Sequence, residues 1–371
     1  MRRRALISLA VLLAAVVAGA AAATAGSTRV HQVGAVTAPQ VRDLAVSPDG
    51  RNVYAATSEG MLTFARDTRT GALTPASVPV DGTPDPQQGA RSVAVSGDGR
   101  SVYVGSAGGG PIAVYARDVA TGQLTAKGSP ATHGAGGGQS LQGTDVAVSA
   151  DGHSVYMTSV AGNSLLTFAR DTRSGTLRQL TGRLGCVAWS ELAGCAAGPG
   201  GLESAQLVAV SPDGRFVVAG GERAVSFVRD PRSGRLTRGR NVPSCANGAC
   251  GQVWSFAFAP NGQLYMTTVG GRLLGFRYHA RRGLVQLAHA SAIVRGSAVA
   301  TVSAGGRAVY VVGAQGSTVT ALRRDPKTGA LKPLPSARLQ NAPHPAAIAA
   351  SRDGRSVYVG SDAGIAVLAR G

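Results

Sequence analysis

Pairs of polar or aromatic residues stand at equivalent positions of a repeated segment, and their types could form a small binding site. In the first five copies the pairs are Arg42-Asp43, Arg91-Ser92, Thr144-Asp145, Gln206-Leu207 and Trp254-Ser255. The sixth and seventh copies carry Ala298-Val299 and Ala346-Ala347 instead. A few aimed polar groups beside apolar surface are what a small-molecule pocket needs. A second interpretation stays open, in which Asp and Arg side chains of neighbouring copies cap one another around a wet channel. Under the first interpretation the ligand-binding residues are Arg42, Asp43, Arg91, Asp145, Gln206 and Trp254.

These residues must be positioned by a repeat that occurs about seven times. Its clearest copy contains an apolar run at 44–47, a Pro-Asp-Gly-Arg turn, and further apolar runs at 52–57 and 61–65, with a fourth strand expected near Leu73. Asp-Gly between apolar runs is a strong hairpin signal. The turn glycine reappears at Gly50, Gly99, Gly152, Gly214, Gly262, Gly306 and Gly354. Four-stranded units repeating at about this period are typical of a β-propeller.

We therefore predict an all-β fold, a seven-bladed β-propeller with four antiparallel strands per blade. The seventh copy ends after its third strand, and residues 29–36 contain an unassigned strand. Pairing that strand with the last blade would close the ring and hide two open edges. The expected propeller covers residues 26–371, with the last blade shared between about 29–36 and 345–371.

The connections between strands predict two different faces of the ring. The turns between strands one and two, and between strands three and four, are short and alike in every copy. The connections on the opposite side vary, as in 75–89, 126–143, 183–204 and 239–251. Binding residues concentrate on varied loops held by a rigid scaffold, so we expect the functional site on the variable side.

An Arg-Asp-x-x-Thr/Ser-Gly-x-Leu element recurs at the turn between strands three and four. We expect Asp67 and its equivalents to hold this turn, because Asp bonds readily to nearby backbone groups, and we expect the arginine to be solvated. An active site is normally single, which argues against a catalytic role. The arginines of the element are Arg66, Arg117, Arg170, Arg229 and Arg324.

The N-terminus has the features of an export signal. Three arginines precede the apolar segment 6–17, and Ala23-Thr24-Ala25 fits a cleavage pattern. We predict a signal peptide at residues 1–25, no membrane anchor after cleavage, and a secreted or cell-wall-associated protein. An oxidising location favours disulfides, and local pairing of Cys186 with Cys195 and of Cys245 with Cys250 is the simplest arrangement. Zinc is the rival interpretation of the cysteines; we expect no metal and no cofactor.

The formal net charge is +18, which could attract anionic surfaces. Only 5% of the residues are aromatic, so no stacking platform for nucleic acid is expected. The expected partners are a small molecule, a peptide or an anionic cell-wall polymer, and we expect a monomer. Two histidines of the variable connections, His133 and His344, are weaker candidates for a general base.

The repeat Val-Ala-Val-Ser-Pro-Asp-Gly-Arg-x-Val-Tyr-Val resembles the lactonase-like seven-bladed propellers and the related Tyr-Val-Thr-Asn-type repeat proteins, over residues 30–371. Leu177–Cys186, together with Cys195 and Val208–Gly214, is similar to exported actinobacterial members. The resemblance implies a 6-phosphogluconolactonase-like fold and acid–base chemistry by a Glu, a His and arginines. Glu222 matches the family glutamate, whereas Gln206 and Leu207 replace its Arg-His pair.

Two functions are compatible with these features. The first is a secreted binding or interaction module that uses the disulfide-bearing loop face. The second is a lactone hydrolase in which Glu222 acts with a channel-mouth arginine, Arg42 or Arg91. Lactone opening needs a base to activate water and a cation to stabilise the oxyanion.

Overall fold

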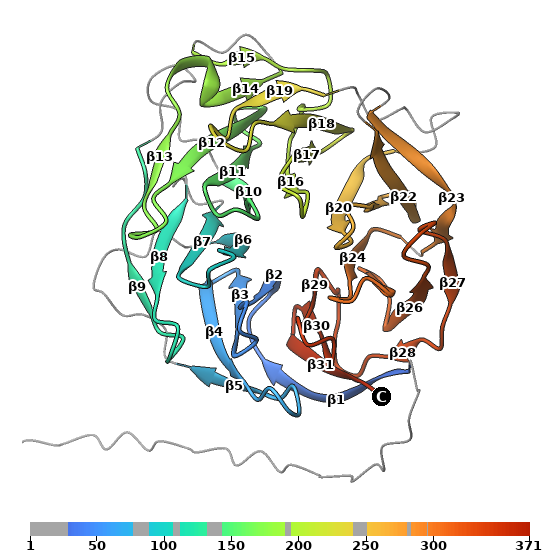
Figure 1. The fold of residues 1–371 in the computed structure, drawn as a ribbon. Helices are drawn as coiled ribbons and strands as arrows, with labels where there is room; N and C mark the ends of the chain where they lie inside the picture. Colours follow the sequence, from blue (N-terminus) through green and yellow to red (C-terminus); the bar gives the residue numbers. More distant parts are fainter. Residues whose placement is uncertain are drawn as a thin grey trace, which may run out of the picture.

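The computed structural model describes residues 29–76, 89–106, 112–131, 143–189, 194–239, 251–279, 283–294 and 296–371. Seven sheets of these residues stand around a common centre like the blades of a wheel (Figure 1). The helix among them is a short 3-10 turn, η1 (Gly182–Leu184), and no helix within these ranges is long and apolar enough to span a bilayer. The prediction of an all-β seven-bladed propeller is confirmed.

Blades 1 to 6 run in sequence order from an innermost strand outward, whereas the outermost strand of blade 7 is the N-terminal β1. Blade 1 contains β2 (Val41–Val46), β3 (Asn52–Thr57), β4 (Gly60–Arg66) and β5 (Leu73–Ala76). Blade 2 contains β6 (Ala90–Val95), β7 (Ser101–Ser106), β8 (Ala113–Arg117) and β9 (Leu124–Ala126). Blade 3 contains β10 (Gly143–Val148), β11 (Ser154–Ser159), β12 (Ser164–Arg170) and β13 (Leu177–Gln179), with β14 (Cys186–Ala188) and β15 (Ala196–Ala197) added at its rim.

Blades 4 to 7 repeat this arrangement. Blade 4 contains β16 (Leu207–Val210), β17 (Phe216–Gly220), β18 (Ala224–Arg229) and β19 (Leu236–Arg238). Blade 5 contains β20 (Val253–Phe258), β21 (Leu264–Thr268), β22 (Arg272–His279) and β23 (Gly283–Ile293). Blade 6 contains β24 (Ala298–Val302), β25 (Ala308–Gly313), β26 (Thr318–Arg324), β27 (Leu331–Pro333) and β28 (Ala337–Arg338). Blade 7 contains β29 (Ala347–Ala350), β30 (Ser356–Ser361), β31 (Gly364–Arg370) and the N-terminal strand β1 (Val30–Thr37).

Strand β1 closes the ring, as the sequence predicts. It pairs antiparallel with β31, from Val30 opposite Arg370 to Thr37 opposite Gly364. Val30 is buried in one apolar cluster with side chains of blades 6 and 7. Another cluster joins Val41 and Leu44 of blade 1 to Ile365 and Val367 of blade 7. The first and last blades therefore bury apolar surface against each other, as neighbouring blades do elsewhere in the ring.

The arginines of the repeated Arg-Asp element lock neighbouring blades together, and the expectation that they are solvated is wrong. Arg117 of blade 2 donates to the Tyr54 hydroxyl oxygen at 2.7 Å and to the Asp49 carboxylate of blade 1 at 2.8 Å. Its side chain has no exposed surface. The same ion pair recurs as Arg66–Asp353, Arg170–Asp98 and Arg229–Asp151. Arg324 bonds Asn261 and Gln263 in the equivalent place.

The aspartate that follows each of these arginines holds its turn, as expected. Asp67 accepts the backbone N–H groups of Arg69 and Thr70 at 2.8 and 2.9 Å. Gly71 completes the turn with φ of 81°, and a Cβ there would clash with the Ser356 hydroxyl of blade 7. The Tyr358 hydroxyl of blade 7 also donates to the Gly71 carbonyl at 2.9 Å. Glycine is thus required at position 71 both by the positive φ of the turn and by the close approach of blade 7.

Two seams between blades depart from this pattern. Between blades 4 and 5, Tyr278 stands where the arginine would be, and its ring lies 3.5 Å from that of Phe216, measured between centroids. Between blades 6 and 7, Arg370 faces Tyr310, but Gly305 replaces the aspartate that would bind the guanidinium. The seven seams are therefore not equally reinforced by charge.

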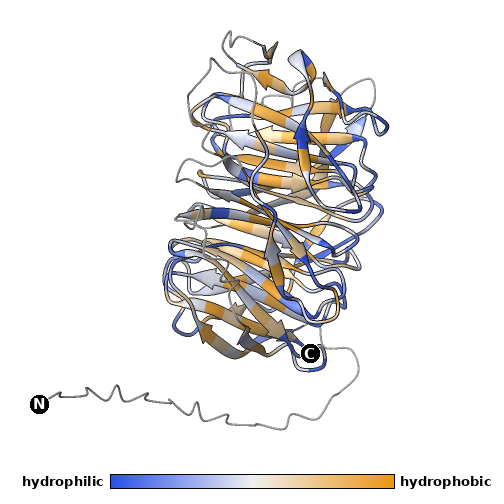
Figure 2. Cartoon of the chain, turned by 90° about the vertical axis from the view of Figure 1, so that its left-hand side faces the viewer, coloured by the Kyte–Doolittle hydropathy of each residue, from blue (hydrophilic) through white to orange (hydrophobic). Residues whose placement is uncertain are grey.

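The two faces of the ring differ as the sequence predicts. We call one the turn face: it carries the connections between the first and second and between the third and fourth strands of each blade, such as 47–51 and 67–72. We call the other the mouth face: it carries the second-to-third turns and the blade-to-blade connections. Hydrophilic loops line the right-hand edge of the ring in Figure 2, the side on which the C-terminus of β31 lies.

Candidate functional site

A cavity of about 480 Å³ lies where the innermost strands begin, at the mouth face of the central channel. Inner strands of all seven blades contribute to it. The six ligand-binding residues predicted from the sequence all line it: Arg42, Asp43, Arg91, Asp145, Gln206 and Trp254. Its volume lies within the range of small-molecule sites. The structure therefore brings together residues that are more than 200 positions apart in the chain.

β-Bulges place three of these residues at the cavity. Between β2 and β3, Val41 pairs with Thr57 and Asp43 with Ala56, so Arg42 is the extra residue. Arg91 and Trp254 are extra residues in the same way, in β6 and β20. A bulge bends its strand and re-aims a side chain, and bulges are frequent next to functional sites. Inner strand β24 pairs regularly, and there the wall is apolar.

The two guanidinium groups face the cavity without a partner. Arg42 is half-buried and Arg91 is exposed. Within the described ranges neither side chain makes a hydrogen bond or an ion pair. Both charges are therefore available to a ligand in the cavity.

The carboxylates of Asp43 and Asp145 tie neighbouring blades together from the cavity wall. Asp43 accepts the N–H of Leu44 at 2.8 Å and that of Val93, in blade 2, at 2.9 Å. Asp145 accepts the N–H of Val146 and that of Val208, in blade 4, both at 2.8 Å. Neither carboxylate forms an ion pair with an arginine of the described residues, so capping of Asp by Arg is not what holds this channel.

Both of these aspartates have a raised pKa. Removal of the carboxyl groups from water raises the pKa of Asp43 to about 6, although the N–H groups of Val93 and Leu44 oppose the change. Burial raises the pKa of Asp145 to about 7, and the charge of Asp43 adds to this increase. At neutral pH the cavity therefore contains an acid close to half-protonation, which suits proton transfer.

Ser92 and Ser255 belong to the polar pairs found in the sequence, but neither they nor Gln252 were predicted among the ligand-binding residues. Ser255 takes the position of the two aspartates in blade 5, and its hydroxyl oxygen accepts the N–H of Ala300 at 3.1 Å. Gln252 and Ser92 also line the cavity. The opposite wall is apolar: Val299, Ala300, Ala346, Ala347 and Ile348. Asp43, Asp145 and Ser255 occupy equivalent positions of the repeat. Their shared role, which is to accept a backbone N–H from another blade, could therefore have been predicted from the sequence.

Glu222 lies away from this cavity. It is exposed in the turn between β17 and β18 and is not among the lining residues. Glu203 folds onto its own loop, where it accepts the backbone N–H of Gly201, and Glu59 is exposed. Among the described residues, a base for chemistry inside the cavity would have to come from Asp43 or Asp145.

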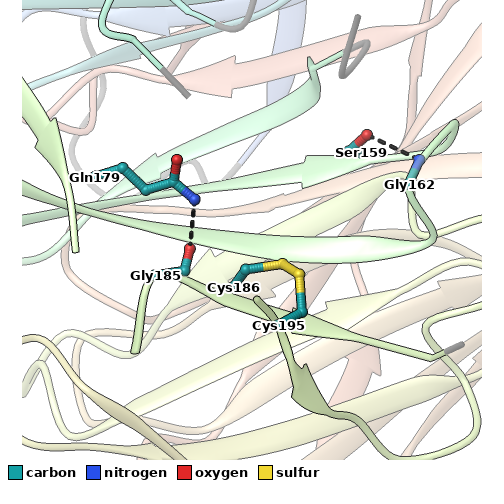
Figure 3. Close-up of a disulfide and its surroundings, with 6 residues drawn as sticks. All are labelled: Ser159, Gly162, Gln179, Gly185, Cys186 and Cys195. Atoms are coloured by element: carbon teal, nitrogen blue, oxygen red, sulfur yellow. Dashed lines mark hydrogen bonds between the residues drawn. A yellow bond between two sulfur atoms is a disulfide. The ribbon is translucent and has the colours of Figure 1, made fainter. Parts of the chain in front are cut away.

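The predicted disulfide between Cys186 and Cys195 is confirmed (Figure 3), with the two Cα atoms 4.7 Å apart. It joins the first residue of β14 to the residue just before the parallel strand β15, at the rim of blade 3 and not at the cavity. The side-chain amide of Gln179 donates to the Gly185 carbonyl at 3.0 Å and holds the approach to Cys186. Cys245 and Cys250 lie outside the described residues, as do His133 and the predicted signal peptide.

His344 and Asp362 form an exposed pair on the mouth face, with Nδ1 2.9 Å from the carboxylate. The imidazole is 74% exposed and does not line the cavity. In the described part of the chain no group of three or more His, Cys, Asp or Glu side chains could hold a metal ion.

Comparison with known proteins agrees with the fold. The family described as lactonase, 7-bladed β-propeller, matches residues 77–184. No curated protein matches the sequence significantly. Hydrazine synthase of Kuenenia stuttgartiensis has a similar structure, with a TM-score of 0.60 and 17% identity over 89% of this chain and 95% of that one.

Two further structures are proteins proposed to be 6-phosphogluconolactonases. The one from Bacteroides uniformis has a TM-score of 0.60 and 21% identity over 85% of this chain and 87% of its own. The one from Bacteroides fragilis has a TM-score of 0.59 and 18% identity over 85% and 86%. At such identities the structural likeness establishes the fold, and the activity has to be argued from the site.

Proposed function

We propose that this chain, a lactonase-like seven-bladed β-propeller, binds a small organic anion in the cavity at the channel mouth. The observation that carries the proposal is the pair of unpartnered guanidinium groups, Arg42 and Arg91, that bulges place beside that cavity. Guanidinium recognises carboxylate and phosphate through two parallel hydrogen bonds. Gln206 and Trp254 supply a neutral donor and an aromatic face, and the alanine and valine wall accepts an apolar part of the ligand.

The protein would meet its ligand outside the cytoplasm. The arginines, apolar segment and small residues of positions 1–25 have the order of an export signal. A cavity of this volume encloses a small molecule or the end of a chain more readily than a long polymer. The anion is therefore expected to be an extracellular metabolite or the terminal group of a larger molecule.

Fluorescence of Trp254 tests the binding proposal. The chain has two tryptophans, Trp189 and Trp254, so a W189F protein reports from the cavity alone. Titration with gluconate, citrate and a hexose phosphate is expected to give a saturable change with at least one of them. Arg42→Gln and Arg91→Gln are each expected to weaken that binding by about 10-fold or more, because a hydrogen bond to a charged group is lost.

Arg223→Gln is the matched control for this titration. Arg223 is exposed on the mouth face but does not line the cavity, so its loss removes the same charge without touching the ligand. Equal affinity of the wild-type, R42Q and R91Q proteins would contradict the proposed site.

A second candidate function is lactone hydrolysis in the same cavity, and the raised pKa of Asp145 favours it. Asp145, when deprotonated, would activate water, and Arg42 or Arg91 would stabilise the oxyanion. The match to the lactonase family supports this class of reaction. Asp145 takes the part of the base here because Glu222 is exposed outside the cavity.

If the protein is a hydrolase, activity toward a panel of lactones is expected to rise with pH through about 7, because the base must lose its proton. Asp145→Asn is expected to lower kcat/KM by about 100-fold or more. Glu222→Gln is expected to leave it unchanged. If E222Q loses activity and D145N retains it, the base is Glu222. If the protein hydrolyses no lactone of the panel, this second candidate function is rejected and only the binding function stands.

A further inference from the structure

Among the described residues, exposed basic side chains gather on the turn face. In five of the blades, the turn between the first and second strands ends in an exposed basic residue. The turns between the third and fourth strands add further exposed basic residues. The exposed basic residues of these turns include Arg51, Arg69, Arg100, Arg173, Arg215, Arg232, Arg235, Arg307, Lys327, Arg352 and Arg355. The repeat therefore gathers on one side of the ring the arginines that are scattered through the sequence.

The acidic residues of the turn face are already used by the fold. Asp49, Asp98, Asp151 and Asp353 pair with the buried arginines. The aspartates of the longer turns accept backbone N–H groups: Asp67, Asp118, Asp171, Asp230 and Asp325. The carboxylates that pair with buried arginines cancel those arginines. The longer-turn aspartates and Asp213, which accepts the N–H of Arg215, keep their negative charge, but the exposed basic residues named above outnumber them.

The mouth face has no such excess among the described residues. Its acidic side chains are Asp43, Glu59, Asp145, Glu203, Glu222 and Asp362, and its basic ones include Arg42, Arg91, Arg223 and Arg272. The ring is thus polarised, with a basic turn face and a mouth face of nearly balanced charge. The electrostatic field of such an uneven charge distribution orients a protein as it approaches a charged surface.

The shape of the turn face suits a planar partner. Its turns are short and nearly equal in length from blade to blade, and they lie along one edge of the ring in Figure 2. The N-terminal strand starts on the same face, because Val30 pairs with Arg370 and the Arg29 carbonyl accepts the N–H of Gly371 at 3.0 Å. The described chain therefore enters the ring on the turn face.

We propose that the turn face docks on the surface of a membrane that contains anionic phospholipids, and that the channel-mouth cavity then faces away from the bilayer. Guanidinium groups bind phosphate oxygens in pairs, and basic residues near an anionic bilayer add to the attraction one by one. The even, extended shape of the turn face favours a planar bilayer over a single polyanionic chain. This proposal is independent of what the cavity binds.

Vesicle co-sedimentation tests the docking surface. A chain beginning at Gly26, which keeps every described residue, is expected to bind phosphatidylcholine vesicles with about 30% phosphatidylglycerol at 0.1 M salt. It is expected not to bind vesicles of phosphatidylcholine alone, and to dissociate above about 0.5 M salt because exposed charges are then screened. The fourfold variant Arg51→Gln, Arg100→Gln, Arg215→Gln and Arg355→Gln is expected to bind at least 100-fold more weakly.

A variant with the same net charge separates docking by this face from general attraction. It replaces four exposed arginines away from the turns with glutamine: Arg183, Arg223, Arg272 and Arg338. This control is expected to retain binding within about threefold of wild type. Equal losses in the two variants would overturn the assignment of the face. Retention by soluble polyglutamate or DNA with no binding to anionic vesicles would overturn the lipid as the partner.

Discussion

Replacing Arg229 with methionine is expected to lower the free energy of unfolding by about 3–5 kcal/mol, the usual cost of removing one partner of a buried ion pair. The Arg229 side chain has no exposed surface, and it binds five groups across and within the seam between blades 3 and 4. It donates to Asp151 at 2.8 Å, to the Tyr156 hydroxyl and the Gly214 carbonyl at 2.9 Å, to Ser154 at 3.0 Å and to Ser149 at 3.3 Å. Methionine fills part of the space but satisfies none of these acceptors.

Urea denaturation measures this loss, and a neighbouring arginine provides the control. Arg232 lies in the following turn and is exposed, so Arg232→Met is expected to change stability by less than about 0.5 kcal/mol. Arg229→Lys is expected to remain destabilised, because an ammonium group cannot reproduce the planar fork. If R229M and R232M unfold at the same urea concentration, the buried pair does not hold the seam.

A double-variant cycle isolates the contribution of the ion pair itself. Asp151 is about one-third exposed, so Asp151→Asn leaves a group that water can still reach. If Arg229 acts through Asp151, the effect of R229M is expected to shrink in the D151N background. Full additivity would assign the stability to the tyrosine, serine and carbonyl contacts instead.

The buried arginines show where sequence reasoning stops. The Arg-Asp element was recognisable from its recurrence, and the role of Asp67 followed from local turn chemistry. The partners of the arginine are not local: Arg117 reaches Asp49 and Tyr54 of the preceding copy. Proximity of this kind appears only when one blade packs on the next. A charged residue conserved in place from copy to copy inside a closed ring is therefore a candidate for an inter-blade contact.

The position of the cavity was predictable from the sequence, whereas the electrostatics of its side chains were not. Taking equivalent residues at the start of each inner strand identified Arg42, Asp43 and Trp254, because a closed ring brings equivalent positions together. The bulges that expose Arg42 and Arg91 leave no recognisable sequence signal, since the extra residue is visible only in the pairing register. The raised pKa of Asp145 also depends on its burial and on the charge of Asp43, which lies about 100 positions earlier in the chain, two blades away in the ring.

Removal of strand β1 is expected to have the largest effect on the protein, because it reopens the ring. A chain that begins at Ala38 loses the pairing of β1 with β31 and the burial of Val30 against blades 6 and 7. The N–H and C=O groups along β31 then form an open edge that can pair with another chain. We expect the melting temperature to fall by roughly 10 °C and the shortened chain to form dimers or larger species in light scattering.

The missing strand can be added back as a peptide. This distinguishes loss of the β1–β31 pairing from a general effect of shortening the chain. The peptide of residues 29–37, Arg-Val-His-Gln-Val-Gly-Ala-Val-Thr, contains the whole of β1, including the irregularity at Val33 in its pairing with β31. It is expected to restore a monomer and to raise the melting temperature with increasing concentration, because a ligand that binds the folded state stabilises it by mass action. A scrambled peptide of the same composition is expected to do neither, since a shift of one residue turns every side chain to the wrong face. If the shortened chain stays monomeric with an unchanged melting temperature, blades 1 and 7 hold the ring shut without β1.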